Sequence, residues 1–226
     1  MTISETEKEV IMLETTTRNE VPVRLFKSDA LEFFTHISPV TVAVVWIPIV
    51  GIFLTLSIME SSAWGVFWHI APAFLAGVFL WTFWEYTIHR FIFHYHPKSE
   101  FGKRINFLFH GNHHLQPMVK TRLVMPPMVS VPLGVFFYSL YFLIFDLLFG
   151  LDFWPKPMFA GTALGYLMYD LTHYATHHFR MKSGYLMQVR SHHMKHHAVS
   201  PDKRFGVTSR LWDFVFGTEP KEETKA

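Results

Sequence analysis

The sequence predicts an all-α integral membrane protein, with about four transmembrane helices and a cytosolic, histidine-rich helical cap that holds a dinuclear metal site. Half of the 226 residues are hydrophobic and 24 are phenylalanine, a bias typical of membrane proteins rather than of soluble cores. The apolar residues form long stretches, and most of the 15 histidines lie in clusters beside these stretches.

Four apolar stretches are the predicted transmembrane helices. A helix needs about 20 apolar residues to cross a hydrocarbon core of roughly 30 Å. Three of the stretches reach that length, and the fourth is shorter, with a possible extension to Tyr174. The stretches are residues 39–58, 64–86, 129–150 and 158–169.

The distribution of lysine and arginine orients these helices. With four crossings, 19 of the 20 basic residues lie on one side of the membrane, and only Lys156 lies on the other. Cytosolic loops carry an excess of basic residues, so that side is predicted to be cytosolic, with both termini and every histidine cluster. The membrane would be the endoplasmic reticulum in a eukaryote and the cytoplasmic membrane in a bacterium.

Three parts are expected along the chain. Residues 1–30 form a cytosolic tail, residues 31–218 a membrane-embedded domain that begins with an interfacial helix near 31–36, and residues 219–226 a C-terminal tail. The N-terminus lacks the apolar region of a cleavable signal peptide. The chain has no cysteine, which excludes disulfides, thiolate zinc sites and cysteine-ligated Fe–S clusters. Its net charge is only +2, and no nucleic-acid partner is expected.

Ten histidines form the candidate metal site. Side chains at i, i+3 and i+4 share a helix face, so each of two HxxHH motifs predicts a three-pronged stripe and HYATH a two-pronged one. His89 and His94 lie about 140° apart on an ideal helix, so one of them is expected past a helix end or on a distorted turn. The ten are His89, His94, His110, His113, His114, His173, His177, His193, His196 and His197.

Ten imidazoles are too many for one metal ion and suit two. Neutral imidazole binds iron, zinc, copper and nickel, so ligand type alone does not identify the metal. The other five histidines are interpreted as surface or core residues. Two positions remain open, because His178 can replace His177 on a rotated helix and His192 also lies four residues before His196.

Two carboxylates lie at helical spacing from candidate ligands. Glu85 is four residues before His89, and Asp170 is three residues before His173. Metal-bound imidazoles commonly donate their second N–H to a carboxylate, which fixes the tautomer. Glu85 and Asp170 are therefore candidates to support the catalytic metal centre. The alternative is that each is a helix-end charge at the membrane boundary.

Six segments resemble the fatty acid hydroxylase superfamily, most closely its fatty acid 2-hydroxylase (sphingolipid α-hydroxylase) branch. The resemblance covers residues 31–218, and the segments occur in the family's order: EYTIHRFIFH, FLFHGNHH, TRLVMPP, YDLTHYATHH, HHMKHH and FGVTSRLWD. The family pattern selects His177 and His193 as ligands. Some members carry a fused cytochrome b5 domain, and residues 1–30 are too few to hold one.

The resemblance implies an O₂-dependent di-iron monooxygenase that hydroxylates C2 of a fatty acyl chain, in a sphingolipid or ceramide or in a free fatty acid. Its implied cofactors are two iron ions, which zinc can replace in purified samples. Electrons are expected from a separate donor protein, similar to cytochrome b5 or ferredoxin. The bilayer and the acyl lipid are the other expected partners.

Other functions are weighed against this one. Sterol desaturases and sphingoid C4-hydroxylases share the histidine pattern, but the EYTIHRF segment around His89 favours the 2-hydroxylase branch. A zinc hydrolase needs few ligands and an open water position, and the chain has no HExxH motif. A non-enzymatic haem or metal protein of the membrane would need isolated histidines inside the spans, where only His69 lies.

Overall fold

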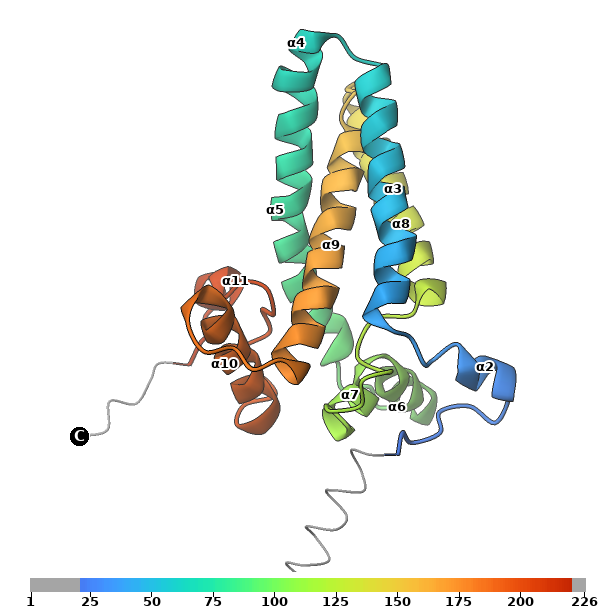
Figure 1. The fold of residues 1–226 in the computed structure, drawn as a ribbon, viewed down its shortest axis with the longest axis vertical. Helices are drawn as coiled ribbons and strands as arrows, with labels where there is room; N and C mark the ends of the chain where they lie inside the picture. The colour runs from blue at the N-terminus through green and yellow to red at the C-terminus, as the bar shows by residue number, and fades with distance from the viewer. Residues whose placement is uncertain (1–20, 221–226) are drawn as a thin grey trace, which may run out of the picture.

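The computed structural model describes residues 21–220, and this part of the chain contains helices but no strands (Figure 1). Four long helices form an elongated bundle, and shorter helices gather at one end of it. The long helices are α3 (Pro39–Met59), α5 (Ala71–Ile88), α8 (Pro127–Tyr141) and α9 (Pro155–His178). The shorter ones at that end are α2 (Asp29–Phe33), α6 (Glu100–Asn106), α7 (Asn112–Leu115), α10 (Gly184–Ala198) and α11 (Leu211–Val215).

Four segments of π-helix interrupt or extend these helices. At the far end of the bundle, the short helix α4 (Ala63–Gly65) leads into one of them. The π-helical segments are η1 (Val66–Ile70), η2 (His89–Phe93), η3 (Phe107–Gly111) and η4 (Phe142–Leu148). Such turns occur frequently at functional sites, and two of the four contain candidate metal ligands.

Within residues 21–220, three helical stretches are long and apolar enough to cross a membrane: Pro39–Met59, Ala63–Phe93 and Pro127–Leu148. They cover the first three predicted spans except for residues 149–150. Their starts follow local chemistry, since Ser38 accepts the N–H of Thr41 ahead of α3, and α8 begins at Pro127, where proline needs no N–H partner. The chain is thus an all-α membrane protein, as predicted.

The predicted fourth span is the middle of α9, which lies among the other long helices (Figure 1). Sixteen of its 24 residues are buried, so α9 contacts protein where the other helices face lipid. Glycines permit this close packing: a Cβ at Gly161 would lie 2.0 Å from the carbonyl oxygen of Phe74 on α5. A helix enclosed in this way needs no continuous apolar surface, and a fourth crossing stays a prediction.

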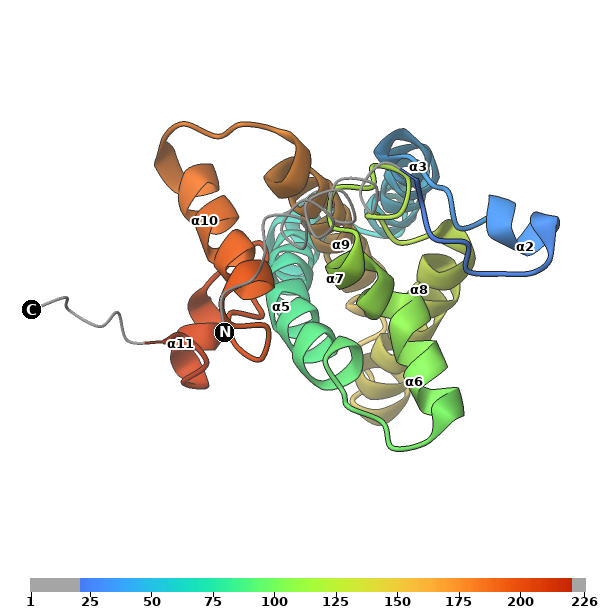
Figure 2. The same ribbon diagram turned by 90° about the horizontal axis from the view of Figure 1, so that it is seen from below.

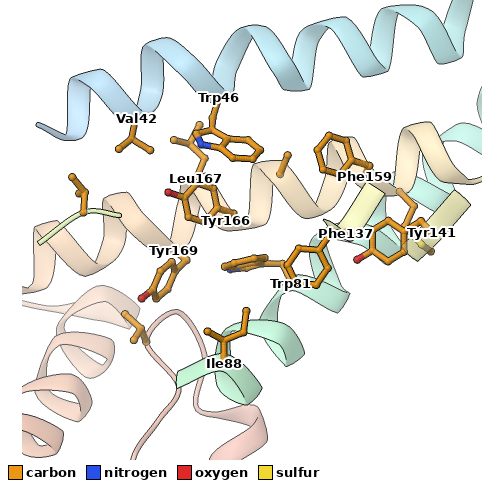
Figure 3. Packing of buried hydrophobic residues seen from close by; sticks show 14 of the residues in the cluster. Val42, Trp46, Trp81, Ile88, Phe137, Tyr141, Phe159, Tyr166, Leu167 and Tyr169 are labelled. Atoms are coloured by element: carbon orange, nitrogen blue, oxygen red, sulfur yellow. The ribbon is translucent and has the colours of Figure 1, made fainter. Parts of the chain in front are cut away.

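Aromatic side chains fill the core between α3, α5, α8 and α9 (Figure 3). The Trp81 ring lies 5.4 Å from the ring of Tyr166, and the Trp46 ring lies 4.9 Å from it on another side, both edge to face. Trp46 also donates its Nε1–H to Ser130 Oγ across 3.1 Å, which ties α3 to α8. This core fixes the ends of α5 and α9, from which the histidines project.

The helices at the histidine-rich end surround the lower ends of α5 and α9, with α10 and α11 on one side and α6, α7 and α2 on the other (Figure 2). Residues 21–36 run along this end as an irregular segment that includes the short helix α2. The side chain of Gln116 receives the N–H of Val23 and donates to the carbonyl of Val21, and Arg122 pairs with Glu32. The helix predicted near 31–36 is present as α2 but covers Asp29–Phe33, and its place at a membrane interface stays a prediction. Residues 1–20 and 221–226 of the predicted tails lie outside the described residues.

Candidate metal centre

The structure brings all ten candidate histidines together as two neighbouring clusters of five. In each cluster the candidate ligand atoms lie within 4.8 Å of one another. The first cluster is His89, His94, His110, His114 and His196, and the second cluster is His113, His173, His177, His193 and His197. Helices from four separate parts of the chain supply them, which explains why one region of sequence does not define the site.

In the first cluster the Nε2 atoms of the five rings converge. The Nε2 of His110 lies 3.1 Å from that of His89 and 3.0 Å from that of His114. The Nε2 of His196 lies 3.1 Å from that of His94 and 3.2 Å from that of His114. All five rings therefore present the same nitrogen to one point.

The second cluster has the same form. The Nε2 of His113 lies 3.0 Å from that of His197 and 3.1 Å from that of His173. The Nε2 of His193 lies 2.9 Å from that of His177 and 3.1 Å from that of His197. Four of the five residues are buried, and only His197 is partly exposed.

These distances fit metal coordination. Metal–nitrogen bonds to imidazole are about 2.0–2.1 Å long, so adjacent ligands at right angles lie about 3 Å apart. A neutral imidazole has a single N–H, and five converging nitrogens cannot all be satisfied by hydrogen bonds to one another. A cation at each centre would accept the lone pairs. The residues present thus fit two metal ions.

The two HxxHH motifs each contribute to both clusters, which corrects the expected single three-pronged stripe. His110 and His114, four residues apart, enter the first cluster, whereas His113 between them enters the second. The C-terminal motif repeats this arrangement with the clusters exchanged. Residues at i and i+4 lie almost directly above one another, and the i+3 side chain diverges enough to reach the neighbouring centre. Each motif therefore links the two centres.

A π-helical turn accounts for the five-residue spacing of His89 and His94. The N–H of His94 donates to the carbonyl of His89 across 3.0 Å, an i to i+5 bond that closes the wider turn of η2. This turn brings the two rings to one side, with their centroids 4.9 Å apart. The predicted distorted turn is present.

The imidazoles outside the membrane spans are held in the neutral, metal-binding form. Burial and neighbouring imidazoles lower the pKa of His94 to about 3 and the pKa of His114 to about 4. Desolvation disfavours a charged ring, and each protonated neighbour would repel it further. Both rings are therefore unprotonated at neutral pH, with lone pairs available for a cation.

The second ring nitrogens of two histidines in the first cluster bind backbone carbonyls. His89 donates its Nδ1–H to the carbonyl of Phe205 across 2.5 Å, and His196 donates its Nδ1–H to that of Lys203 across 2.6 Å. A carbonyl only accepts, so these bonds place the proton on Nδ1 and leave the Nε2 lone pair free. The orienting groups are carbonyls of one loop rather than the carboxylates predicted.

Glu85 and Asp170 bind backbone and hydroxyl groups, which corrects the expected contacts with ligand imidazoles. Glu85 receives the N–H of Val207 at 2.5 Å and that of Thr208 at 2.7 Å, and also the Thr208 hydroxyl. Asp170 receives the N–H of Met125 at 3.2 Å and the Tyr166 hydroxyl at 3.1 Å. Helical spacing predicted contacts with ligands, but the backbone N–H groups that both acids bind belong to loops distant in sequence.

Asp213 is a supporting residue that the sequence reasoning missed. Fully buried, it receives the N–H groups of Phe205 at 2.8 Å and Gly206 at 2.7 Å. His192 donates to it at 3.1 Å and Thr218 at 2.7 Å. Burial alone would raise the pKa of Asp213, but hydrogen bonds from these groups lower it, so the carboxylate is ionised. The sequence feature that could have identified Asp213 is its position in the FGVTSRLWD segment.

Four of the remaining five histidines also have defined positions. His192 lies beside Asp213 and Glu219 rather than in a cluster, and His178 packs its ring 4.5 Å from that of Tyr174. His177 and His193 are the members placed in the second cluster, as the resemblance selected. His69 stacks on Phe153, and His36 binds Thr121 at the opposite end of the bundle.

An apolar cavity of about 260 Å³ adjoins both clusters. Its walls come from residues 25–35, η3, residues 122–129 and α9. Three cluster histidines line it, namely His110, His113 and His173. Met128 and Val129, in the first turn of the candidate span α8, line it as well. The cavity therefore connects the imidazoles with the end of a membrane helix.

Membrane helices, ten converging imidazoles and an adjoining apolar cavity define a membrane protein whose histidine clusters could hold metal beside an apolar cavity. Comparison with known proteins gives its family. The family model described as fatty acid hydroxylase matches residues 74–218. The chain belongs to the fatty acid hydroxylase family.

Individual relatives agree with this assignment. The dihydroceramide fatty acyl 2-hydroxylase FAH1 of Arabidopsis thaliana is 38% identical over 197 residues, which are 87% of this chain and 80% of the plant protein. The human fatty acid 2-hydroxylase is 34% identical over 222 residues, 89% of this chain and 58% of the human protein. A solved structure of full-length scs7p, with only its hydroxylase domain visible, superposes with a TM-score of 0.76 at 36% identity and covers 84% of this chain and 70% of that one.

Proposed function

We propose that the protein is a monooxygenase that hydroxylates C2 of a fatty acyl chain in a sphingolipid. The observation that carries this proposal is the apolar cavity that contacts His110, His113 and His173 from both clusters. An acyl chain in that cavity lies beside both centres. Relatives named fatty acid 2-hydroxylase and dihydroceramide fatty acyl 2-hydroxylase, at 34% and 38% identity, support the same reaction.

The chain's own residues bind and orient the reactants. The ten histidines would hold two iron ions, which supply the activation of O₂ needed to attack an unactivated C–H bond. Phe93, Leu108 and Val124 line the cavity with apolar surface, which excludes water from the reacting carbon. Zinc can occupy the same ligands, because imidazole does not discriminate strongly between these metals.

The position of the cavity supports attack near the carbonyl end of the acyl chain. The cluster residues belong to the end of the bundle that carries α7 and α10, where the candidate span Ala63–Phe93 ends. Figure 1 shows these helices at one end of the long helices. A lipid whose polar head stays at the membrane interface presents its first carbons at this level, while its mid-chain carbons stay in the hydrocarbon. C2 is the methylene next to the carbonyl and is the favoured position.

The charges around the cavity favour an amide-linked acyl chain over a free fatty acid. Arg122 is the only lysine or arginine among the described residues that line it, and its side chain is 5% exposed and paired with Glu32. The carboxylate of a free fatty acid would lie next to Asp170, and Arg122 would not neutralise it because Arg122 is already paired with Glu32. Burying an unpaired charge is costly, whereas an amide is neutral. The substrate is thus a ceramide-like lipid.

Electrons reach the site from a separate donor protein, similar to cytochrome b5 or ferredoxin. The sequence has no cysteine, so it holds no cysteine-ligated Fe–S cluster that could deliver them. The protein is a multi-pass membrane protein whose histidine-rich end and termini face the cytosol. The excess of lysine and arginine at that end supports this orientation.

Two engineered cysteines test the orientation, since the native chain has none. Ser62 caps α4 at one end of the bundle and Ser99 caps α6 at the other, and both are exposed. We expect a membrane-impermeant thiol reagent to label Ser62→Cys in intact cells and to label Ser99→Cys only after permeabilisation. Labelling of Ser99→Cys in intact cells would reverse the assigned orientation.

Lipid analysis tests the proposed reaction. We expect expression of the chain in a host that lacks 2-hydroxy lipids to produce sphingolipids with a hydroxyl group at C2 of the acyl chain. The position of the hydroxyl is mapped by fragmentation in a mass spectrometer. A new double bond, a sterol product or a hydroxyl group on the sphingoid base would contradict the proposal.

A further inference from the structure

The two clusters differ in how their second ring nitrogens are satisfied. In the first cluster, the Nδ1–H groups of His89 and His196 donate to the carbonyls of Phe205 and Lys203. In the second cluster, four of the five Nδ1 atoms are buried without a hydrogen-bond partner among the described residues. They belong to His173, His177, His193 and His197. The two clusters thus share ligand type and differ in support.

The supporting carbonyls of the first cluster belong to a loop that buried carboxylates hold on two sides. Asp213 receives the N–H groups of Phe205 and Gly206, and Glu85 receives those of Val207 and Thr208. The relative exposure of Asp213 is 0% and that of Glu85 is 3%. Four consecutive amides are therefore fixed, and the loop at residues 203–208 is fixed with them.

This support has a direct consequence for metal affinity. A hydrogen bond at Nδ1 orients the ring, fixes its tautomer and raises its basicity, and losing such a bond typically lowers metal affinity by about 10- to 100-fold. A ring without such a partner from the protein gains none of this orientation or added basicity. A cluster of five imidazoles therefore binds an ion more tightly when its Nδ1–H groups have hydrogen-bond partners than when they have none.

We propose that the two metal sites are unequal: the first cluster retains its ion firmly, the second cluster exchanges its ion readily, and Glu85 and Asp213 act as positioning residues for the first site through the loop at residues 203–208. The inference rests on the proposed binding of two metal ions by the ten histidines. The proposed difference is in the affinity of each cluster for its metal ion and does not depend on the reaction.

Timed metal removal tests the inequality. Purified protein is loaded with zinc, exposed to EDTA, freed of chelate at intervals and assayed for zinc per chain by inductively coupled plasma mass spectrometry. We expect one ion to leave about 10- to 100-fold faster than the other. His197→Ala, in the second cluster, should retain one ion that leaves at the slow rate. His94→Ala, in the first cluster, should retain one that leaves at the fast rate.

The positioning residues are tested by Asp213→Asn and Glu85→Gln. Each replacement leaves one acceptor oxygen where two now serve several donors, so the slow ion should leave at nearly the fast rate. Asp170→Asn is the matched control, because this buried carboxylate holds Met125 instead of the loop, and the slow rate should persist. Thr208→Val removes a single hydrogen bond to Glu85 and gives a milder variant if the others fail to fold.

The outcomes separate this inference from the proposed function. Two ions that leave at one rate, or a slow ion assigned to the second cluster by the alanine variants, would overturn the inequality and leave the hydroxylase proposal standing. A slow rate unchanged in folded Asp213→Asn, Glu85→Gln and Thr208→Val would overturn the positioning role. A chain that binds two unequal ions but forms no 2-hydroxy lipid would contradict the proposed function alone.

Discussion

Replacement of His196 or His113 by alanine is expected to abolish hydroxylation and to lower the metal content from close to two ions per chain to about one. Each residue is the single histidine that its HxxHH motif gives to the opposite cluster, so each loss leaves four imidazoles around one centre. Mutation of residues that merely support ligands typically costs 10–100-fold. Loss of a ligand should therefore cost at least about 100-fold in product formed.

The matched control is His96→Ala. His96 is exposed, lies two residues after His94 and belongs to neither cluster. We expect this variant to keep both its metal content and its product level. Metal content and 2-hydroxy lipid are measured on the same preparations. A His196→Ala protein that retains two ions and normal activity would rule out the dinuclear assignment.

Filling the cavity should stop the reaction without removing metal. Val129 lines the cavity from the first turn of α8, and Val129→Trp places an indole where the acyl chain is expected. Because a misplacement of about 1 Å can cost about 100-fold in rate, we expect a loss of about that size or more. The zinc or iron content should stay at the wild-type level, since the substitution removes no ligand.

Val135→Trp is the matched control for this substitution. It makes the same replacement on the same helix, but Val135 is 61% exposed and does not line the cavity. We expect its activity to remain near that of the wild type in a membrane host. Equal loss in both variants would indicate that bulk on α8 acts through folding, and wild-type activity of Val129→Trp would place the acyl chain elsewhere.

Much of this architecture follows from local patterns in the sequence. Apolar stretches of about 20 residues need only length and composition to be recognised as spans, and helices occupy all of them. Eight of the ten histidines are likewise identified by spacing, and the family pattern selects His177 and His193. The odd spacing of His89 and His94 even predicts a distorted turn, which is the π-helical segment η2. Such features depend on residues a few positions apart.

Features that depend on how helices are placed relative to one another could not be predicted from the sequence. The division of each HxxHH motif between two clusters requires the rotation of α7 and α10 about their axes, which spacing does not contain. Glu85 and Asp170 lie at helical spacing from ligands, yet they bind Val207 and Met125, which are distant in sequence. The cavity combines residues 25–35 with residues 122–129, and no local pattern joins them.

The length of α9 illustrates the same limit. Its apolar part covers the predicted residues, but the helix extends from Pro155 to His178 because its ends are buried against other helices and the clusters. Membrane hydropathy describes a lipid-facing helix well and an enclosed one poorly. Tertiary contacts, rather than composition, set the length of such a helix.

The most direct test of the account is to follow the oxygen atom into the product. The chain is expressed in a host that lacks 2-hydroxy lipids, under ¹⁸O₂, and its sphingolipids are analysed by mass spectrometry. We expect one ¹⁸O atom in each new hydroxyl group, located at C2 of the acyl chain, with none formed by the His196→Ala variant. A hydroxyl oxygen derived from water, or a hydroxyl group at another position, would contradict the account.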